Sequence, residues 1–431
     1  MWTSARILRI FFLTVMVFLP GQNSFAQDLK LSELIEEALK NNPDLLASQS
    51  KIEAAGYRVP QSKALPDPMV MVGYQNEGLR RYTYGMEPDA QWMFSASQMF
   101  PYPGKLALKG SMAESDLESL KAMHEFLKRK TEANVKNLYY DLFLAYKEIA
   151  LLEDKADLFA RIEDLALARY SAGKAMQEEV LMAQTEKYML LEKEEMLRQK
   201  IRSYEAMLSA LLGRKEFIPI GRPVDPVYQT FPFDADEAER IALNNSSEIK
   251  SINKMKDSVG YKVVMAEKEY YPDFTVTMEY SKRGNDFMDM WSTKVGINIP
   301  LFYKTKQEPA VREAKASLTQ ADHELEAAKL MISASVKDNF SMIMSSEKLM
   351  DIYKNGLIPK NTQSVESAVT GYSTGGTDMI TVMSLSKTLL DYETLYWEQF
   401  TEREKAIARL EAIMEVAASS TGGNQDEKTS H

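Results

Sequence analysis

Apolar residues recur every three or four positions over two very long stretches of this chain, residues 105–169 and 306–370. In the first stretch the spacing is kept by Val135, Leu138, Leu142, Tyr146 and Ile149. Such a seam is typical of helices that pack against other helices along their whole length. At 1.5 Å per residue, a helix of about 65 residues would be about 100 Å long. Pro359 lies inside the second stretch and should kink that helix or end it early.

Shorter helices are predicted before and after each long one. The preceding helices cover residues 32–64 and 235–268, and the following helices cover residues 177–212 and 378–415. A following helix together with the next preceding helix is nearly as long as one long helix. The pattern therefore predicts a long rod that runs antiparallel to two shorter rods stacked end to end.

The turns that end the two long helices share a Tyr-x-x-Gly pattern, at Tyr170–Gly173 and Tyr372–Gly375. Glycine permits the positive φ that a tight reversal between two helices needs. Both turns are therefore predicted at the far ends of the rods, and Asp378 follows the second turn directly.

Two aromatic-rich regions, each about 35 residues long, separate the preceding helices from the long ones. Polar and apolar residues alternate in these regions, which predicts β-hairpins at about 68–100 and about 272–300. The first strand, residues 69–74, alternates poorly. The candidate membrane-interface aromatic residues are Tyr74, Trp92, Phe94, Tyr280 and Trp291.

Short alternating strands with aromatic ends are typical of transmembrane β-strands, although a soluble sheet with one buried face alternates in the same way. No segment after residue 26 has the run of about 20 apolar residues that a transmembrane helix needs. A membrane-spanning part would therefore consist of β-strands. Four strands cannot close a barrel, so this interpretation requires several chains that each contribute four strands.

The chain contains two collinear copies of the same plan, residues 27–222 and 223–417. The matches include Pro66–Pro68 with Pro272–Phe274, His124 with His323, and Val135–Asn137 with Val336–Asp338. In the first copy the hairpin is followed by long helices at about 104–212, and in the second by long helices at about 305–415. The joint between the copies is rich in proline and is predicted to be extended.

The N-terminal residues 1–26 are predicted to be a signal peptide. Arg6 and Arg9 precede an apolar run from Ile10 to Leu19, and small residues lie at the predicted cleavage site after Ala26. We therefore expect the protein to be exported. Residues 418–431 are rich in Ser, Thr, Gly and charged residues, which predicts a disordered tail.

Composition excludes several functions. The formal net charge of -10 gives no electrostatic footprint for nucleic acid. The absence of cysteine excludes disulfides, thiolate metal sites, a cysteine nucleophile and an N-terminal lipid on cysteine. With only three His, we predict no metal site, and we interpret His124, His323 and the 26 Met as helix-packing or surface residues. No catalytic constellation and no cofactor motif is found, so an enzyme is not expected.

In these features the chain resembles the TolC-type outer-membrane efflux family. The motifs that carry the resemblance are Ala64–Pro68, Phe100–Lys105, Tyr271–Phe274, Ile299–Phe302 and the two Tyr-x-x-Gly turns. The Leu-Pro-Asp-Pro and Pro-x-Pro-Gly-Lys forms look closest to the CusC/CzcC-like heavy-metal branch. The resemblance covers nearly the whole chain after residue 26.

The resemblance implies an α+β membrane protein, in which a trimer completes a 12-stranded outer-membrane barrel above a coiled-coil helical barrel in the periplasm. It further implies a passive exit duct for small molecules or metal ions. The expected partners are a periplasmic adaptor protein, an inner-membrane transporter of the resistance-nodulation-division type, and outer-membrane lipid. Many members carry a lipidated N-terminal cysteine; this chain has none, so anchoring would rest on the barrel.

By the same resemblance, Tyr170, Gly173, Tyr372 and Gly375 would form the tips that dock the adaptor, although the pattern also fits a plain helix–helix turn. Asp378 is a candidate lumen or gate carboxylate, because threefold symmetry would repeat it as a ring. It equally fits a solvated helix start, where a carboxylate complements the helix dipole. The alternative for the whole chain is a secreted, soluble coiled-coil scaffold or adhesin whose aromatic segments form an ordinary sheet.

Overall fold

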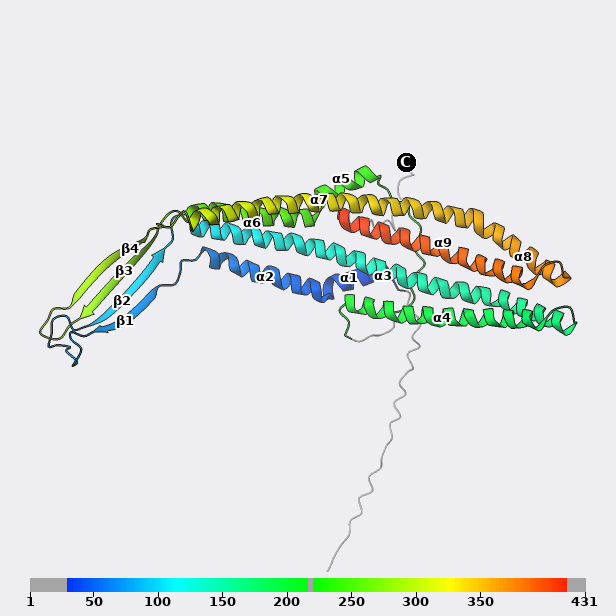
Figure 1. Cartoon of the computed structure of the whole chain (residues 1–431), viewed down its shortest axis with the longest axis horizontal. Coiled ribbons are helices and arrows are strands. Elements are labelled where there is room, and N and C mark those ends of the chain that lie inside the picture. Colours follow the sequence, from blue (N-terminus) through cyan, green and yellow to red (C-terminus); the bar gives the residue numbers. More distant parts are fainter. Residues whose placement is uncertain (1–28, 216–219, 417–431) are drawn as a thin grey trace, which may run out of the picture.

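An elongated bundle of helices carries one β-sheet at one end (Figure 1). The computed structural model describes residues 29–215 and 220–416. The predicted signal peptide and C-terminal tail therefore lie outside the described residues. No helix within the two described ranges is both long and apolar enough to cross a membrane.

The described helices follow the predicted order, with additional breaks. They are α1 Leu31–Asn41, α2 Pro43–Lys63, α3 Lys105–Ser171, α4 Gln177–Leu211, α5 Ala235–Asn245, α6 Ser247–Lys268, α7 Gln307–Asp351, α8 Ile358–Thr374 and α9 Met379–Met414. The strands are β1 Met69–Gln75, β2 Gln91–Phe100, β3 Asp273–Lys282 and β4 Met290–Asn298.

Each preceding helix is divided into two helices, at Asn42 and at Ser246, where one helix was predicted. The Asn42 side chain accepts hydrogen bonds from the backbone N–H groups of Asp44 and Leu45, and Ser246 accepts one from Ile249. These side chains cap a new helix start, and Asn and Ser are favoured at that position. The cap residues therefore end one helix and begin the next.

The long helix α3 lies at the centre of the bundle (Figure 1). The predicted seam is present, since Val135 and Leu142 have no exposed surface and Ile149 is 8% exposed. Helices α2 and α4 cover successive lengths of one side of α3, and α6 and α9 cover the other side. Beyond them, α7 and α8 pack on α6 and α9.

The short helices stack differently from the prediction. We expected α4 to be continued by α6, the next helix toward the sheet, but the two lie on opposite sides of α3. Instead α2 continues α4, because the Asn42 side-chain amide donates to the Leu211 carbonyl at 2.9 Å. In the same way α6 continues α9, since Asn245 donates to the Met414 carbonyl at 3.3 Å.

The chain crosses α3 after α4, and this crossing explains the different stacking. Leu29 forms a parallel bridge with Pro223 of the extended joint. The buried hydroxyl of Tyr139 in α3 lies 3.1 Å from the Leu29 carbonyl and 3.2 Å from the Val224 carbonyl. One α3 side chain thus fixes the segments that begin the two repeats, and no periodic pattern in the sequence indicates this contact.

The second long helix is interrupted where Pro359 was expected to disturb it. Six residues, Ile352–Leu357, form a π-helical turn between α7 and α8, and Pro359 lies in the first turn of α8. Pro359 has no N–H to donate to the carbonyl four residues earlier, so a regular α-helix would leave that carbonyl unpaired. π-helical turns are wider than α-helical turns and accommodate an extra residue.

The second long helix contains one residue more than the first, and this extra residue lies at the π-helical turn. Buried positions of α7 follow those of α3 at an offset of 201, as in 135 to 336 and 142 to 343. In α8 the offset is 202, as in 159 to 361 and 166 to 368. The extra residue therefore lies between residues 343 and 361, where the π-helical turn is found.

The offset of 201 also corrects the predicted match between His124 and His323. It pairs His124 with Leu325, and both of these side chains are 8% exposed, whereas His323 is exposed. Burial lowers the pKa of the His124 imidazole, which favours its neutral form inside the helix seam. The two histidines are therefore not equivalent, and their similar sequence neighbourhoods were misleading.

The four strands form one antiparallel sheet in the order β1-β2-β3-β4. Its two outer strands, β1 and β4, each have a single partner strand within the described part of the chain. The helices join the sheet at one end, and loops 76–90 and 283–289 lie at the other end (Figure 1).

Candidate functional site

One face of the sheet is mostly apolar, with Gln98, Lys282 and Thr293 as its polar residues. The register places Tyr74 opposite Trp92, and Phe94 opposite Tyr280, which is in turn opposite Trp291. These five predicted interface aromatics therefore share one face, at two adjacent levels near the loops. The same face continues toward the helices with Val70, Val72, Ala96, Val276, Met278, Val295 and Ile297.

The opposite face of the sheet is mostly hydrophilic. Glu279 and Lys294 lie opposite each other and form an ion pair of 2.9 Å. Ser95 lies beside Glu279, and Ser97 lies beside Thr277. We refer to this as the polar face. A sheet with one apolar face and one polar face can separate a hydrophobic surrounding from water.

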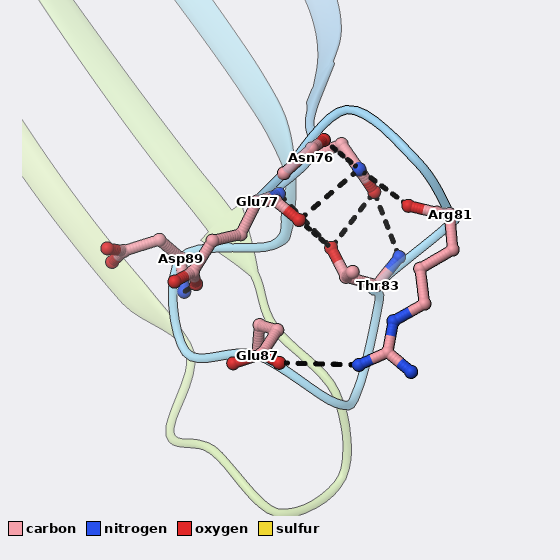
Figure 2. Close-up of polar contacts among 7 residues, drawn as sticks. Asn76, Glu77, Arg81, Thr83, Glu87 and Asp89 are labelled. Atoms are coloured by element: carbon pink, nitrogen blue, oxygen red, sulfur yellow. Dashed lines mark hydrogen bonds and ion pairs between the residues drawn. The ribbon is translucent and has the colours of Figure 1, made fainter.

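The loop between β1 and β2 is held together by Asn76 (Figure 2). The Asn76 amide donates to the carbonyls of Gly78 at 2.7 Å and Arg81 at 2.8 Å. Its oxygen accepts the backbone N–H of Thr83 at 2.9 Å and the Tyr74 hydroxyl at 2.7 Å. Because Asn76 satisfies the backbone of its own loop, it ends β1 at Gln75 and fixes the outer limit of the sheet.

The two helix turns lie at the other end of the molecule from the sheet (Figure 1). Gly173 and Gly375 have φ values of 69° and 88°, in the left-handed region that favours glycine. The chain reverses at both, as the Tyr-x-x-Gly pattern predicted.

The two tyrosines of these turns differ in their surroundings. Tyr170 is 44% exposed, whereas Tyr372 is 1% exposed and packs against the first turn. The Tyr372 hydroxyl donates to Glu179 at 2.5 Å, and the Arg169 guanidinium lies 4.4 Å from the Tyr372 ring centroid. Burial, and then the hydrogen bond to Glu179, raise the pKa of the Tyr372 phenol, so it keeps its proton.

Arg169 and Glu179 were not among the predicted site residues. Glu179 lies in the first turn of α4, and its second oxygen accepts the backbone N–H of Met176 at 3.4 Å. The sequence contains many charged residues near helix ends, so nothing distinguished these two. Together with Tyr372 they connect the α3–α4 turn to the α8–α9 turn.

Asp378 caps the start of α9. Its carboxylate accepts the backbone N–H of Thr381 at 2.7 Å and is exposed. Hydrogen bonds from the Thr381 hydroxyl and backbone lower the pKa of the Asp378 carboxyl, so it stays ionised. In the described ranges no group of three or more His, Asp or Glu side chains is placed to hold a metal ion.

Comparison with known proteins identifies the family to which this architecture belongs. The family model "Outer membrane efflux protein" matches residues 34–214 and 240–414, most of the chain. The chain belongs to the outer membrane efflux protein family. This confirms the predicted relationship, and members of the family are channels rather than enzymes. No curated protein matches the sequence.

Solved structures of outer-membrane channels share this fold. The outer-membrane channel OprN is 14% identical, with 89% of each chain covered and a TM-score of 0.77. VceC from Vibrio cholerae is 17% identical, with 90% of this chain and 97% of that chain covered and a TM-score of 0.77. CusC is 15% identical, with 90% and 93% covered and a TM-score of 0.73. CusC is thus no more similar than the other two, and the heavy-metal branch stays a prediction.

For a channel of this family, the contact at the helix turns gives a first test. Tyr372→Phe keeps the aromatic ring against Arg169 but removes the hydrogen bond to Glu179. A hydrogen bond to a charged group contributes about 1.5–3 kcal/mol, so the two turns should separate more readily. We expect a higher single-channel conductance in planar lipid bilayers. Tyr170→Phe is the matched control and should conduct like the wild type; equal conductance of both variants would contradict the role of Tyr372.

Proposed function

We propose that three copies of this chain form the exit duct of a tripartite efflux system, through which small molecules or metal ions pass passively from the periplasm to the exterior. The observation that carries the proposal is the open four-stranded sheet with one apolar, aromatic-rich face. Unpaired edge strands pair readily with further strands. Joining β4 of each copy to β1 of the next would make three times four strands into a closed 12-stranded barrel.

The outer edges of the helical layer support the same assembly. Helix α4 lies at one edge and α7 at the other (Figure 1). The exposed large apolar side chains at these edges include Leu181, Tyr188, Leu191 and Met196 on α4, and Leu330, Met331 and Met344 on α7. Large apolar side chains that gather on an exposed surface often mark an interface. Helix α2 extends the α4 edge and α8 extends the α7 edge (Figure 1). Contact between the α2–α4 edge of one copy and the α7–α8 edge of the next would cover these side chains and close a helical tube in the periplasm.

In this assembly the apolar face of the sheet contacts outer-membrane lipid, and the polar face lines the channel. The turns at Tyr170–Gly173 and Tyr372–Gly375 then point into the periplasm, where they dock a periplasmic adaptor that is coupled to an inner-membrane transporter of the resistance-nodulation-division type. Asp378 would recur as a ring of three carboxylates near the tip. The protein is exported by its signal peptide and is anchored by the barrel without lipid.

Reconstitution of the purified full-length protein tests this proposal. We expect native mass spectrometry in detergent to show a trimer, and planar bilayers to show discrete single-channel currents. The five predicted interface aromatics lie near the loops of the sheet, away from the helices, so we expect the protein to insert with its helices on one side of the bilayer only. Protease added to the side that holds the helices should then cleave them. A monomer that stays soluble without detergent and gives no currents would instead support a secreted scaffold or adhesin.

A further inference from the structure

The polar face of the sheet carries four methionines on its first hairpin. Met69 and Met71 lie on β1, and Met93 and Met99 lie on β2. Met69 is opposite Ser97 and Met71 is opposite Ser95, so the register assigns these thioethers to the hydrophilic side. Met69, Met71 and Met99 are 59%, 52% and 39% exposed.

The four methionines occupy successive levels of this face. Met71 is two residues from Met69 on β1, and Met93 lies opposite Gly73, one level further out. Ser97 lies opposite Met69, and Met99 follows two residues later on β2, one level closer to the helices. Successive levels on one face are about 7 Å apart, and diagonal neighbours are within reach of long side chains. We call this row, about 20 Å long, the methionine ladder.

Gly73 leaves space for the outermost member of the ladder. The Met93 Cε lies 3.6 Å from the position that a Cβ on Gly73 would occupy. The Met93 side chain therefore extends over Gly73 of β1. Met93 thus reaches the strand that carries Met69 and Met71.

The second hairpin shows that the fold does not require these thioethers. Aligning the repeats on Pro66 with Pro272 and on Pro101 with Pro300 identifies the equivalent positions. They are Thr275, Thr277, Ser292 and Asn298. These four residues lie on the same face of the same sheet. Hydroxyl and amide side chains occupy these four positions, and the second hairpin carries one methionine, Met290, on this face. The fold therefore does not require four thioethers on one hairpin, and the methionines of the first hairpin need another explanation.

Their chemistry indicates a ligand. A thioether sulfur is a soft, polarizable, uncharged donor, and such donors select Cu⁺ and Ag⁺ over hard cations such as Mg²⁺. The chain has no cysteine, so no thiolate competes for soft ions. The carboxylate of Glu279 on this face is engaged by Lys294 at 2.9 Å. The thioethers are therefore the soft ligands that the face offers.

The spacing of the thioethers is better suited to the passage of metal ions than to their tight binding. A site with one or two thioethers holds an ion weakly, and the next site lies about 7 Å along the strand. Conduction requires sites that attract an ion but release it easily, and several such sites in a row meet this requirement. Each transfer exchanges one sulfur–metal contact for another, and no electron or proton is moved.

We propose that the methionine ladder binds soft monovalent cations, Ag⁺ or Cu⁺, and guides them along the channel wall. This inference rests on the proposed function, because the polar face has to line the channel. Soft metal ions would then be a cargo that this chain itself helps to select, through the methionine ladder.

Silver binding by the full-length trimer tests the ladder. The variant combines Met69→Leu, Met71→Leu, Met93→Leu and Met99→Leu, which removes the four sulfur atoms and keeps the side chains apolar and similar in volume. In nitrate buffer, calorimetry with AgNO₃ should show at least tenfold weaker Ag⁺ binding for this variant than for the wild type. Met278→Leu, on the apolar face of the same sheet, is the matched control and should bind Ag⁺ like the wild type. Equal Ag⁺ binding by the quadruple variant and the wild type would overturn the inference.

Potassium conductance of the same preparations separates the two proposals. If the quadruple variant conducts K⁺ like the wild type but has lost Ag⁺ binding, the ladder is supported and the duct is intact. If both conduct and both bind Ag⁺ equally, the ladder is wrong and the duct stands. If the wild type neither forms a trimer nor conducts, both proposals fail.

A test in cells distinguishes metal ions from apolar cargo. In the host strain, the quadruple leucine variant should lower the tolerated silver concentration severalfold and leave the tolerance to organic dyes unchanged. Leucine preserves an apolar wall, so loss of silver tolerance would be due to the missing sulfur atoms. Unchanged silver tolerance would overturn the role of the ladder in export.

Discussion

Replacing Val295 by arginine is expected to reduce the amount of assembled channel in the outer membrane at least tenfold. Val295 lies near the centre of β4 on the apolar face, opposite Val276, and is 64% exposed. A lipid-facing arginine near the middle of the bilayer costs about 2–4 kcal/mol, and about 1.4 kcal/mol already changes an equilibrium tenfold. The trimer would carry this cost three times. Immunoblots of separated membrane fractions measure the result.

Thr275→Arg is the matched control for Val295→Arg. Thr275 lies on the polar face of β3, opposite Gly296, which leaves room for a long side chain. Water in the channel would solvate the added charge, so we expect assembly close to that of the wild type. If Thr275→Arg prevents assembly and Val295→Arg does not, the two faces have been assigned to the wrong surroundings.

The second large effect is expected for Arg403→Ala in α9. Arg403 has no exposed surface. Its guanidinium donates to Glu347 at 2.8 Å, to Glu404 and to the Gln229 carbonyl, and it lies 4.2 Å from the Tyr228 ring centroid. Removing one partner of a buried ion pair costs about 3–5 kcal/mol, because the other charge stays buried and unpaired. Circular dichroism should show a melting temperature lowered by several degrees.

Arg409→Ala provides the comparison for Arg403→Ala on the same helix. Arg409 is half-buried and lies 3.9 Å from Glu402, and loss of such a pair costs about 1 kcal/mol or less. Trypsin should also cleave the joint between the repeats faster in Arg403→Ala, because Tyr228 and Gln229 lose their contact with α9. Equal melting temperatures of the two variants would show that Arg403 does not stabilise the fold in this way.

The defect of Arg403→Ala should depend on pH. Burial raises the pKa of Glu404, and the neighbouring Arg403 opposes this effect. Without Arg403, the folded protein would bind a proton at Glu404 more tightly than the unfolded chain does. Stability would then rise as the pH falls through the folded pKa, so the difference from the wild type should be smaller at pH 5 than at pH 8.

The sequence predicted the elements that depend on local patterns. The spacing of Val135, Leu142 and Ile149 defined the buried seam of α3, and the glycines of the Tyr-x-x-Gly turns defined the reversals. These features are determined within a few turns of chain. The resemblance added the family, which the match to residues 34–214 and 240–414 confirmed.

Features that depend on contacts between distant segments were not predicted. Nothing in the sequence distinguishes Tyr372 from Tyr170, yet only Tyr372 is buried, because it meets Glu179 of the other repeat. Arg403 is one charged residue among several on α9, and its burial follows from the path of the joint. The poor alternation of residues 69–74 now has a cause: Met69 and Met71 are hydrophobic by type but lie on the polar face.

The π-helical turn at Ile352–Leu357 has a consequence for the evolution of the rod. One inserted residue would rotate every later residue of an α-helix by about 100° and turn the Tyr372 ring away from Glu179. The wider turn absorbs the insertion, and Ala166 and Ala368 remain buried at equivalent places. The segment thus restores the rotational position of the later residues around the helix axis. It allows the two long helices to differ in length by one residue while the tips keep their alignment.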